Sequence, residues 1–416
     1  MTSADEAGAR GLGGPRRLLL PYAEIFRIPR AWRFSVAGII GRMPMAMFGL
    51  GTVLLISAVT GRYGVAGSVS AAGALGMAAC TPQIARLVDT YGQRRVLVPL
   101  VLVFVSSVAG LIVAVQLRAP DWALFLPGIA GGATMPALGP MARARWSVLL
   151  GDSPRLHTAF SLESVADEVC FVLGPAIVTV LATQLHPAAG VAAAALLCLA
   201  GTLWFASQRE TEPAASSLAP SRPARAASRH LLPAPGLAVL MPVYLCLGSM
   251  FVSIDLSTVD FAAHAGHKPL AGFILGCYAL GSATGGLWYG TRSWTAPAQR
   301  RLAVTLTMTV AGVCTFWAMP NLLILTILIY LCGLTIAPTL IAGYSLLESQ
   351  SVPGRTTEAM SWLGTGIGVG VALGATAVGF ILDAFGPRWG YGFAACSGGA
   401  SVLICLAGLR RLSARA

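Results

Sequence analysis

Charged residues are scarce in this chain of 416 residues: Asp, Glu, Lys and Arg make up 11%, against roughly 25% in soluble domains. Hydrophobic residues make up 56%. Because the deficit of charge extends over the whole length, it excludes an ordinary soluble protein and predicts a polytopic membrane protein. The net charge of +12 does not indicate nucleic-acid binding, since the basic residues cluster between apolar segments.

Several chemical motifs are also missing. The nine cysteines include no CxxC pair, so neither a metal site nor a disulfide framework is predicted. No GxxxxGK[ST] nucleotide loop and no Ser/His/Asp constellation occur, and the first 34 residues lack the apolar core of a signal peptide. We therefore expect a protein that is not an enzyme and needs no cofactor.

Apolar runs long enough to cross a bilayer are what the sequence does contain. They lie at about 35–60, 65–88, 96–117, 122–148, 157–183 and 187–208, and again at about 236–263, 269–291, 302–319, 321–346, 357–384 and 390–410. We predict an all-α membrane protein of 12 transmembrane helices. Its expected parts are a basic N-terminal segment 1–34, a six-helix half 35–208, a linker 209–235, a second half 236–410 and a tail 411–416.

The basic residues predict the orientation. Between spans on one side they are limited to Arg62, Arg118, Lys268 and Arg388, whereas the other side carries nearly all the remaining arginines. By the positive-inside rule, both termini lie in the cytoplasm. We expect a location in the inner (cytoplasmic) membrane.

One segment carries acids inside a span. The stretch 155–181 has an ungapped echo about 200 residues later, which indicates a duplicated half. Its acids are Glu163, Asp167 and Glu168, and the echo has Leu363, Ile367 and Gly368 in their places. Carboxylates within a membrane are costly and persist mostly where they have partners or a function.

The loop after the second span reads ARLVDTYGQRR. With Asp89, Gly92, Arg94 and Arg95 it resembles the signature of the major facilitator superfamily. The resemblance implies two parallel halves, each with inverted three-helix repeats, and a loop that latches one conformation of the transport cycle. The pattern is most similar to the 12-helix drug and solute proton antiporters. Span 4 lacks their Arg, and span 5 lacks the paired glycines after Gly-Pro.

The chemistry of this loop is consistent with a latch. Asp89 can accept hydrogen bonds from the N-terminus of a helix in the opposite half, where the helix dipole favours a negative charge. Gly92 permits a tight turn, and Arg94 and Arg95 would anchor the loop on the inner face. The alternative is an ordinary acidic turn with arginines that only set topology.

Arg42 lies within the first span at nearly the depth of Asp167 and Glu168. The resemblance to the major facilitator superfamily implies that spans 1 and 5 are neighbours, so we predict an ion pair between Arg42 and one of these acids. Arg42, with Met45, Met47 and Phe48, would line an adaptable substrate site, since Met suits promiscuous surfaces. The alternative is a pair that only fixes helix packing.

Proton coupling is assigned to Asp167, Glu168, Glu163 and Asp255. Glu163 and Asp167 are four residues apart and share a helix face, whereas Glu168 points about 100° away. Asp255 in the seventh span is a second proton candidate. Arg143 and Arg145 at the end of span 4 could instead neutralise Glu163 and make it structural. Glycines and prolines in span 4, among them Pro136, predict a kink there.

We predict a secondary transporter that exports a small organic compound by proton antiport and alternating access. Uptake of a small polar solute by proton symport is the alternative, and a membrane sensor or scaffold without transport is a third class. The expected partners are the small-molecule substrate, protons and the lipid bilayer. We expect no nucleic acid, a monomer, and the proton gradient as the driving force.

Overall fold

The computed structural model describes residues 14–151, 153–215, 234, 236–267, 270–292, 294–352 and 354–413. The rest of the predicted N-terminal segment, most of the predicted linker, Lys268 and the last three residues lie outside the described part. Within that part every regular element is a helix, in agreement with the predicted all-α class.

The helices form two groups in chain order. The first comprises α2 (Gly14–Phe26), α3 (Ala31–Arg42), α4 (Pro44–Thr60), α5 (Tyr63–Tyr91), α6 (Gln93–Gln116), α7 (Asp121–Thr134), α8 (Leu138–Leu150), α9 (Arg155–Gln184), α10 (Ala189–Ser207) and the short η1 (Arg209–Thr211). The second comprises α12 (Leu237–His264), α13 (Leu270–Gly290), α14 (Ala298–Thr315), η3 (Phe316–Ala318), α15 (Leu322–Gly333), α16 (Ile336–Ser349), α17 (Thr356–Phe385) and α18 (Pro387–Ser413).

Eleven helical segments in the described part of the chain are long and apolar enough to cross a membrane. The remaining predicted span is α7 followed by α8, which is interrupted between Thr134 and Leu138. Met135 is extended there, with φ −65° and ψ 121°, as expected for a residue before a proline. The predicted kink in span 4 is therefore confirmed, and the count is twelve spans in two halves.

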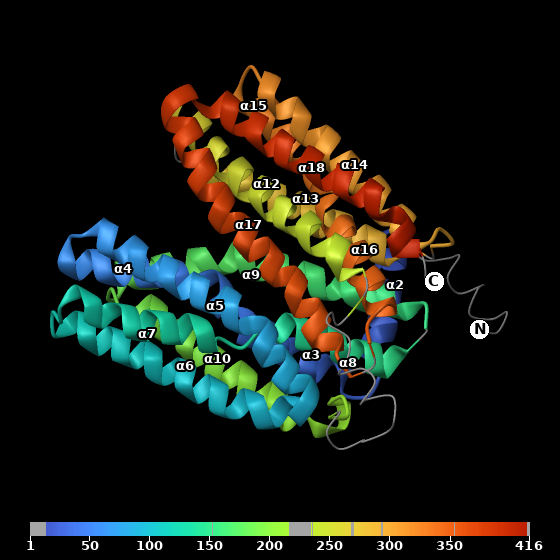
Figure 1. Ribbon diagram of the computed structural model, residues 1–416, viewed down its shortest axis with the longest axis horizontal. Helices are drawn as coiled ribbons and strands as arrows, with labels where there is room; N and C mark the ends of the chain where they lie inside the picture. The colour runs from blue at the N-terminus through green and yellow to red at the C-terminus, as the bar shows by residue number, and fades with distance from the viewer. Residues whose placement is uncertain are drawn as a thin grey trace.

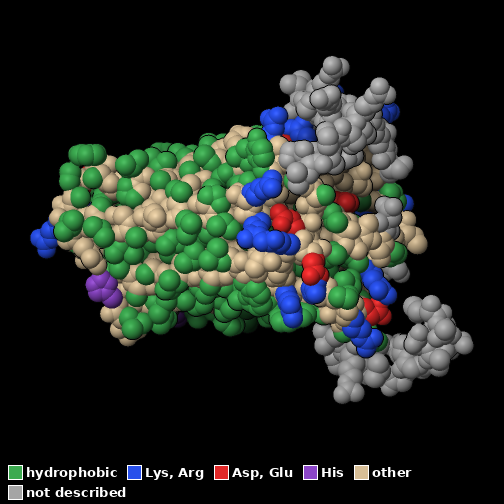
Figure 2. All heavy atoms as spheres, turned by 90° about the horizontal axis from the view of Figure 1, so that it is seen from below, with side chains coloured by type: hydrophobic (Ala, Val, Ile, Leu, Met, Phe, Trp, Pro, Cys, Tyr) green, Lys and Arg blue, Asp and Glu red, His purple; other side chains and the backbone are tan. Residues whose placement is uncertain are grey.

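The two halves meet at one end of the molecule and diverge toward the other (Figure 1). We call the meeting end the basic end, because Arg94, Arg95, Arg300 and Arg410 are exposed there. Figure 2 shows a band of Arg and acidic side chains near this end and a broad apolar surface beyond it. This distribution is that of a protein embedded in a bilayer.

Burial along α9 and α17 shows how the halves separate. Most residues in the first turns of α9 are buried, whereas Phe171, Val172 and Leu173 farther along are about half exposed, at 54%, 45% and 46%. The corresponding part of α17 behaves in the same way, with Leu373 61% exposed. The largest buried cluster joins residues of both halves, such as Phe160 and Leu363. The contact between the halves is therefore concentrated toward the basic end.

Candidate functional site

Arg42 is the centre of a buried charge cluster in the first half. It ends α3, and Pro44 starts α4 after a shortened turn in which the N–H of Met43 donates to Ile40 at 3.4 Å. This bend directs the Arg42 side chain to α9, where it forms ion pairs with Glu163 and with Asp167, the latter at 2.8 Å. The predicted pairing of Arg42 with Asp167 is confirmed, and Glu168 takes no part in it.

Glu163 and Asp167 share one face of α9, as predicted, and each has further donors. The indole N–H of Trp146 donates to Glu163 at 2.9 Å. Arg143 pairs with Asp167 at 2.8 Å. Glu163 is 0% exposed and both arginines are 2% exposed. Two guanidinium groups thus balance two carboxylates, of which Asp167 is 24% exposed, and such pairing is what makes buried charge tolerable.

Neither Arg143 nor Arg145 forms an ion pair with Glu163, which was the alternative role considered for them, although Arg143 is an ion-pair partner as predicted. Arg143 binds Asp167 instead. Arg145 donates to the side chain of Gln93 at 2.7 Å and to the carbonyl of Phe205 at 3.0 Å. Residues two apart in a helix point about 200° away from each other, so these two arginines cannot serve the same acid. Arg145 holds the ends of α6 and α10 together.

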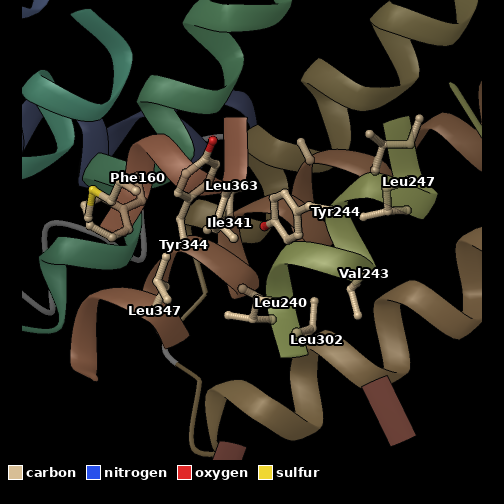
Figure 3. Close-up of a cluster of buried hydrophobic side chains, with 14 of the residues drawn as sticks. Phe160, Leu240, Val243, Tyr244, Leu247, Leu302, Ile341, Tyr344, Leu347 and Leu363 are labelled. Carbon is tan, nitrogen blue, oxygen red and sulfur yellow. The ribbon is translucent and has the colours of Figure 1, made fainter. Parts of the chain in front are cut away.

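Arg143 also links the charge cluster to the second half. Its guanidinium lies 4.2 Å from the centre of the Tyr344 ring on α16. Tyr344 in turn packs edge-on against Tyr244 of α12, with 6.0 Å between ring centres. Figure 3 shows these two tyrosines among the buried apolar side chains that also include Phe160 of α9. Nothing in the sequence spacing identified Tyr344.

Glu168 faces the opposite half, as its position about 100° from the Asp167 face requires. It accepts a hydrogen bond from Ser282 of α13 at 2.6 Å. Asp255 of α12 is exposed and close enough to Glu168 for their charges to interact. Among the described residues, no arginine or histidine forms an ion pair with either acid. One carboxylate from each half therefore lies at the surface between them, and the part of the chain that the structure describes supplies no balancing cation in an ion pair.

The structure does not match the predicted substrate wall on α4. Met47 is 0% and Phe48 5% exposed, because Met47 packs toward α9 and Phe48 against Phe104 of α6. Arg42 is equally enclosed. Met45 differs, since it is 40% exposed. In this conformation Met47 and Phe48 belong to the packing of the first half and offer no surface to a substrate.

The end of α5, just before the turn at Gly92, contacts the opposite half as predicted. Asp89 accepts hydrogen bonds from the backbone N–H groups of Thr357, at 3.3 Å, and Glu358, at 2.9 Å. These groups belong to the first turn of α17, where the helix dipole favours an anion. Gly92 has φ +95°, a conformation open mainly to glycine. The side chains of Arg94 and Arg95 are exposed beside it.

Several contacts that the sequence did not reveal close the same end. Thr158 of α9 donates to the carbonyl of Gly290 at 2.7 Å, and Ser161 donates to that of Gly286. Tyr22 of α2 donates to Leu287 at 2.9 Å. The glycines of α13 indicate in the sequence a surface for close helix packing, but they do not identify α9 as the neighbour.

Comparisons with known proteins agree with this arrangement of two helical bundles. The model of the Major Facilitator Superfamily matches residues 34–293 and 245–415. The chain therefore belongs to the Major Facilitator Superfamily, and it is a multi-pass membrane protein of the secondary transporter class. No curated protein matches the sequence.

Solved structures share the fold at low identity. The human organic anion transporter MFSD10 (TETRAN) has a TM-score of 0.70 and 17% identity, with 91% of this chain and 100% of that chain covered. A bacterial homologue of the iron transporter ferroportin in an outward-facing state has a TM-score of 0.71 and 14% identity over 92% and 99%. The transporter FucP in an outward conformation has a TM-score of 0.69 and 14% identity over 91% and 98%.

Proposed function

We propose that this protein exports a small organic compound from the cytoplasm in exchange for protons. The observation that carries the proposal is the placement of Glu168 and Asp255 at the surface between the halves, without a balancing cation among the described residues. A carboxylate in such a place can become neutral only by binding a proton. Proton coupling needs a group of this kind, which is charged in one conformation and neutral in another.

The four coupling candidates then have different roles. The charges of Glu163 and Asp167 are balanced by Arg42 and Arg143, so these two acids hold α3, α8 and α9 together. The Glu168 carboxylate accepts its hydrogen bond from Ser282 of the other half. Separation of α9 from α13 at the basic end would break that bond and change the surroundings of Glu168. This supports coupling between protonation of Glu168 and the movement of the halves.

The orientation follows from the arginines. The basic end would face the cytoplasm by the positive-inside rule, with both termini there and the protein in the inner membrane. Asp89 would then latch the cytoplasmic side closed through α17. The conformation would be open to the outside, where an antiporter takes up its proton. A monomer driven by the proton gradient, without a cofactor, completes the proposal.

A second candidate is proton-coupled uptake of a small polar solute. The opening away from the basic end is also the state in which a symporter would load its solute. The Ser282 hydroxyl beside Glu168 would supply a polar contact for it. In this case protons and solute would move in the same direction.

Transport by purified protein in proteoliposomes separates the two. A compound library is first screened for thermal stabilisation, because a ligand that binds the folded state raises the melting temperature. The compounds found are then followed across an imposed pH gradient. Movement against the proton flux supports antiport, and movement with it supports symport. Absence of any proton-coupled movement for compounds that bind would refute both.

Four variants test the roles of the acids. Glu168→Gln and Asp255→Asn should each abolish or strongly reduce proton-driven accumulation while leaving exchange without a gradient measurable. Asp167→Asn should mainly lower stability. Asp121→Asn is the matched control, since Asp121 is exposed and pairs with Arg62. Full proton-driven transport by both Glu168→Gln and Asp255→Asn would show that the coupling role is wrong.

A further inference from the structure

A groove runs along the outer face of the second half, between α14 and α18. Both helices lie on the side of that half away from the first half (Figure 1). The groove has a volume of about 640 Å³, within the roughly 300–1,000 Å³ of ligand pockets. It belongs neither to the charge cluster nor to the surface between the halves.

The chemistry of the groove changes along its length. At the basic end it is lined by Gln299, Arg300 and Arg410, and both arginines are exposed. Farther along α14 its wall is apolar, with Val304 50% and Met308 57% exposed. Among the described residues that line the groove there is no carboxylate. Positive charge is therefore concentrated at one end of an otherwise apolar channel.

The start of α14 adds a further attraction for an anion. The N-cap residue is Pro297, which offers no side-chain cap, and the first turn contains no acidic residue. The first N–H groups of a helix lack partners within the helix and carry its positive dipole. They lie at the same end of the groove as Arg300, because Pro297 and Gln299 line it too.

The length of the apolar wall matches one leaflet of a bilayer. From Arg300 to Ala311 the chain advances 11 residues along α14, which is on the order of 16 Å at the helical rise. The hydrocarbon core of a bilayer is about 30 Å thick, so this wall spans about half of it. An acyl chain anchored by its headgroup at Arg300 would extend along Val304 and Met308 to Ala311.

We propose that this groove binds one anionic phospholipid, with the phosphate between Arg300, Arg410 and the start of α14, and an acyl chain along α14 and α18. The complementarity of charge selects an anionic headgroup over a zwitterionic one, and the apolar wall selects a lipid over a soluble phosphate. Each basic residue at the surface of a membrane strengthens the binding of anionic lipids about fivefold.

Retention of lipid by the purified full-length protein tests the proposal. Native mass spectrometry compares phosphatidylglycerol with phosphatidylcholine of the same chains, titrated into detergent micelles. We expect phosphatidylglycerol to be retained more tightly, and the variant Arg300→Gln/Arg410→Gln to bind it about 30-fold more weakly. This factor corresponds to about 2 kcal/mol at 1.4 kcal/mol per tenfold.

A matched control removes the same charge elsewhere at the basic end. Arg27→Gln/Arg33→Gln changes two exposed arginines of the first half, and it should leave phosphatidylglycerol binding unchanged. If this variant loses binding to the same extent, the effect is one of general surface charge and the proposed site is wrong. Equal retention of the two lipids by the parent protein would also overturn the proposal.

A third variant tests the apolar part and stands even if the arginine variant fails to fold. Ala311→Trp places a large side chain at the far end of the groove and keeps both arginines. We expect it to weaken phosphatidylglycerol binding severalfold, whereas the soluble headgroup glycerol phosphate should not compete in any of the proteins. Full competition by glycerol phosphate, or no effect of Ala311→Trp, would contradict a lipid as the occupant.

Discussion

Removal of Arg42 should strongly destabilise the first half. Glu163 is 0% exposed and Arg42 is its cationic partner. Arg42→Gln would leave the Glu163 carboxylate buried with only the neutral donors Trp146 and Ser35. Breaking a buried ion pair by removing one partner costs about 3–5 kcal/mol, and we expect a loss of this size in the free energy of unfolding.

The double variant Arg42→Gln/Glu163→Gln separates lost charge balance from lost packing. It leaves no uncompensated charge at this position, and the amide oxygen that replaces the Glu163 carboxylate could still accept from Trp146. We therefore expect it to be more stable than Arg42→Gln alone, with a coupling free energy of about 1–3 kcal/mol between the two sites. Asp167 keeps Arg143 in both variants, so the comparison isolates Glu163.

The assay is unfolding of the purified protein in mixed micelles with increasing denaturing detergent. Arg62→Gln is the matched control, because Arg62 pairs with Asp121 at 2.8 Å while the two side chains are 59% and 45% exposed. An exposed pair contributes about 0–1 kcal/mol. If Arg42→Gln destabilises no more than Arg62→Gln, or if the double variant is less stable than the sum of the two single changes predicts, the account of a balanced buried cluster is refuted.

Three further predictions concern the basic end. Asp89→Asn should weaken the two hydrogen bonds to α17 by about 1–2 kcal/mol, so those two amides should exchange hydrogen about 5- to 30-fold faster; unchanged exchange would refute the latch. Gly290→Val should speed exchange along the start of α9, since a Cβ there would lie 2.6 Å from the Ser161 Cβ, whereas Gly272→Val has open space and should not. Burial raises the pKa of Glu212, so the charged carboxylate destabilises the folded protein at pH values above the ordinary pKa of Glu. The melting temperature of Glu212→Gln should therefore rise relative to that of the parent as pH increases from about 4 to about 7. A fall in this difference with increasing pH would contradict the reasoning.

The fold could be predicted because the bilayer sets the length of each span. Twelve apolar runs and the placement of arginines suffice for the architecture. The prolines of span 4 predicted the break between α7 and α8. They did not predict that the break would end α7 after only 14 residues. Apart from the contact of Asp89 with α17, which the loop motif predicted, contacts between the halves depend on how the two bundles rotate against each other, and no local pattern specifies that rotation.

The site also has a part that the sequence could predict and a part that it could not. Depth placed Arg42 level with Asp167 and Glu168, because rise per residue fixes depth in a spanning helix. It could not choose between these two acids, which differ by one residue, and the resemblance supplied the expectation that their helices are neighbours. Met47 and Phe48 could not be placed, because the turn at Pro44 sets the rotation of α4 and turns both into the interior. Tyr344 and Ser282 lie in the other half, and no spacing in the sequence connects them with Arg143 or Glu168.

The duplicated helices α9 and α17 show what the two halves contribute. Both bury a residue every fourth position in their outer parts, with Gly174 and Gly374 in equivalent places. Where α9 has Glu168, α17 has Gly368, which leaves open space around it. The charge that α17 lacks is supplied by Asp255 on α12. A carboxylate therefore reaches the surface between the halves from both sides, but from different helices. A rocking motion that parts α9 from α13 would change the surroundings of Glu168, whereas Asp255 would stay with its own bundle. That asymmetry would give the proposed proton site a conformation-dependent partner in one half and a fixed position in the other.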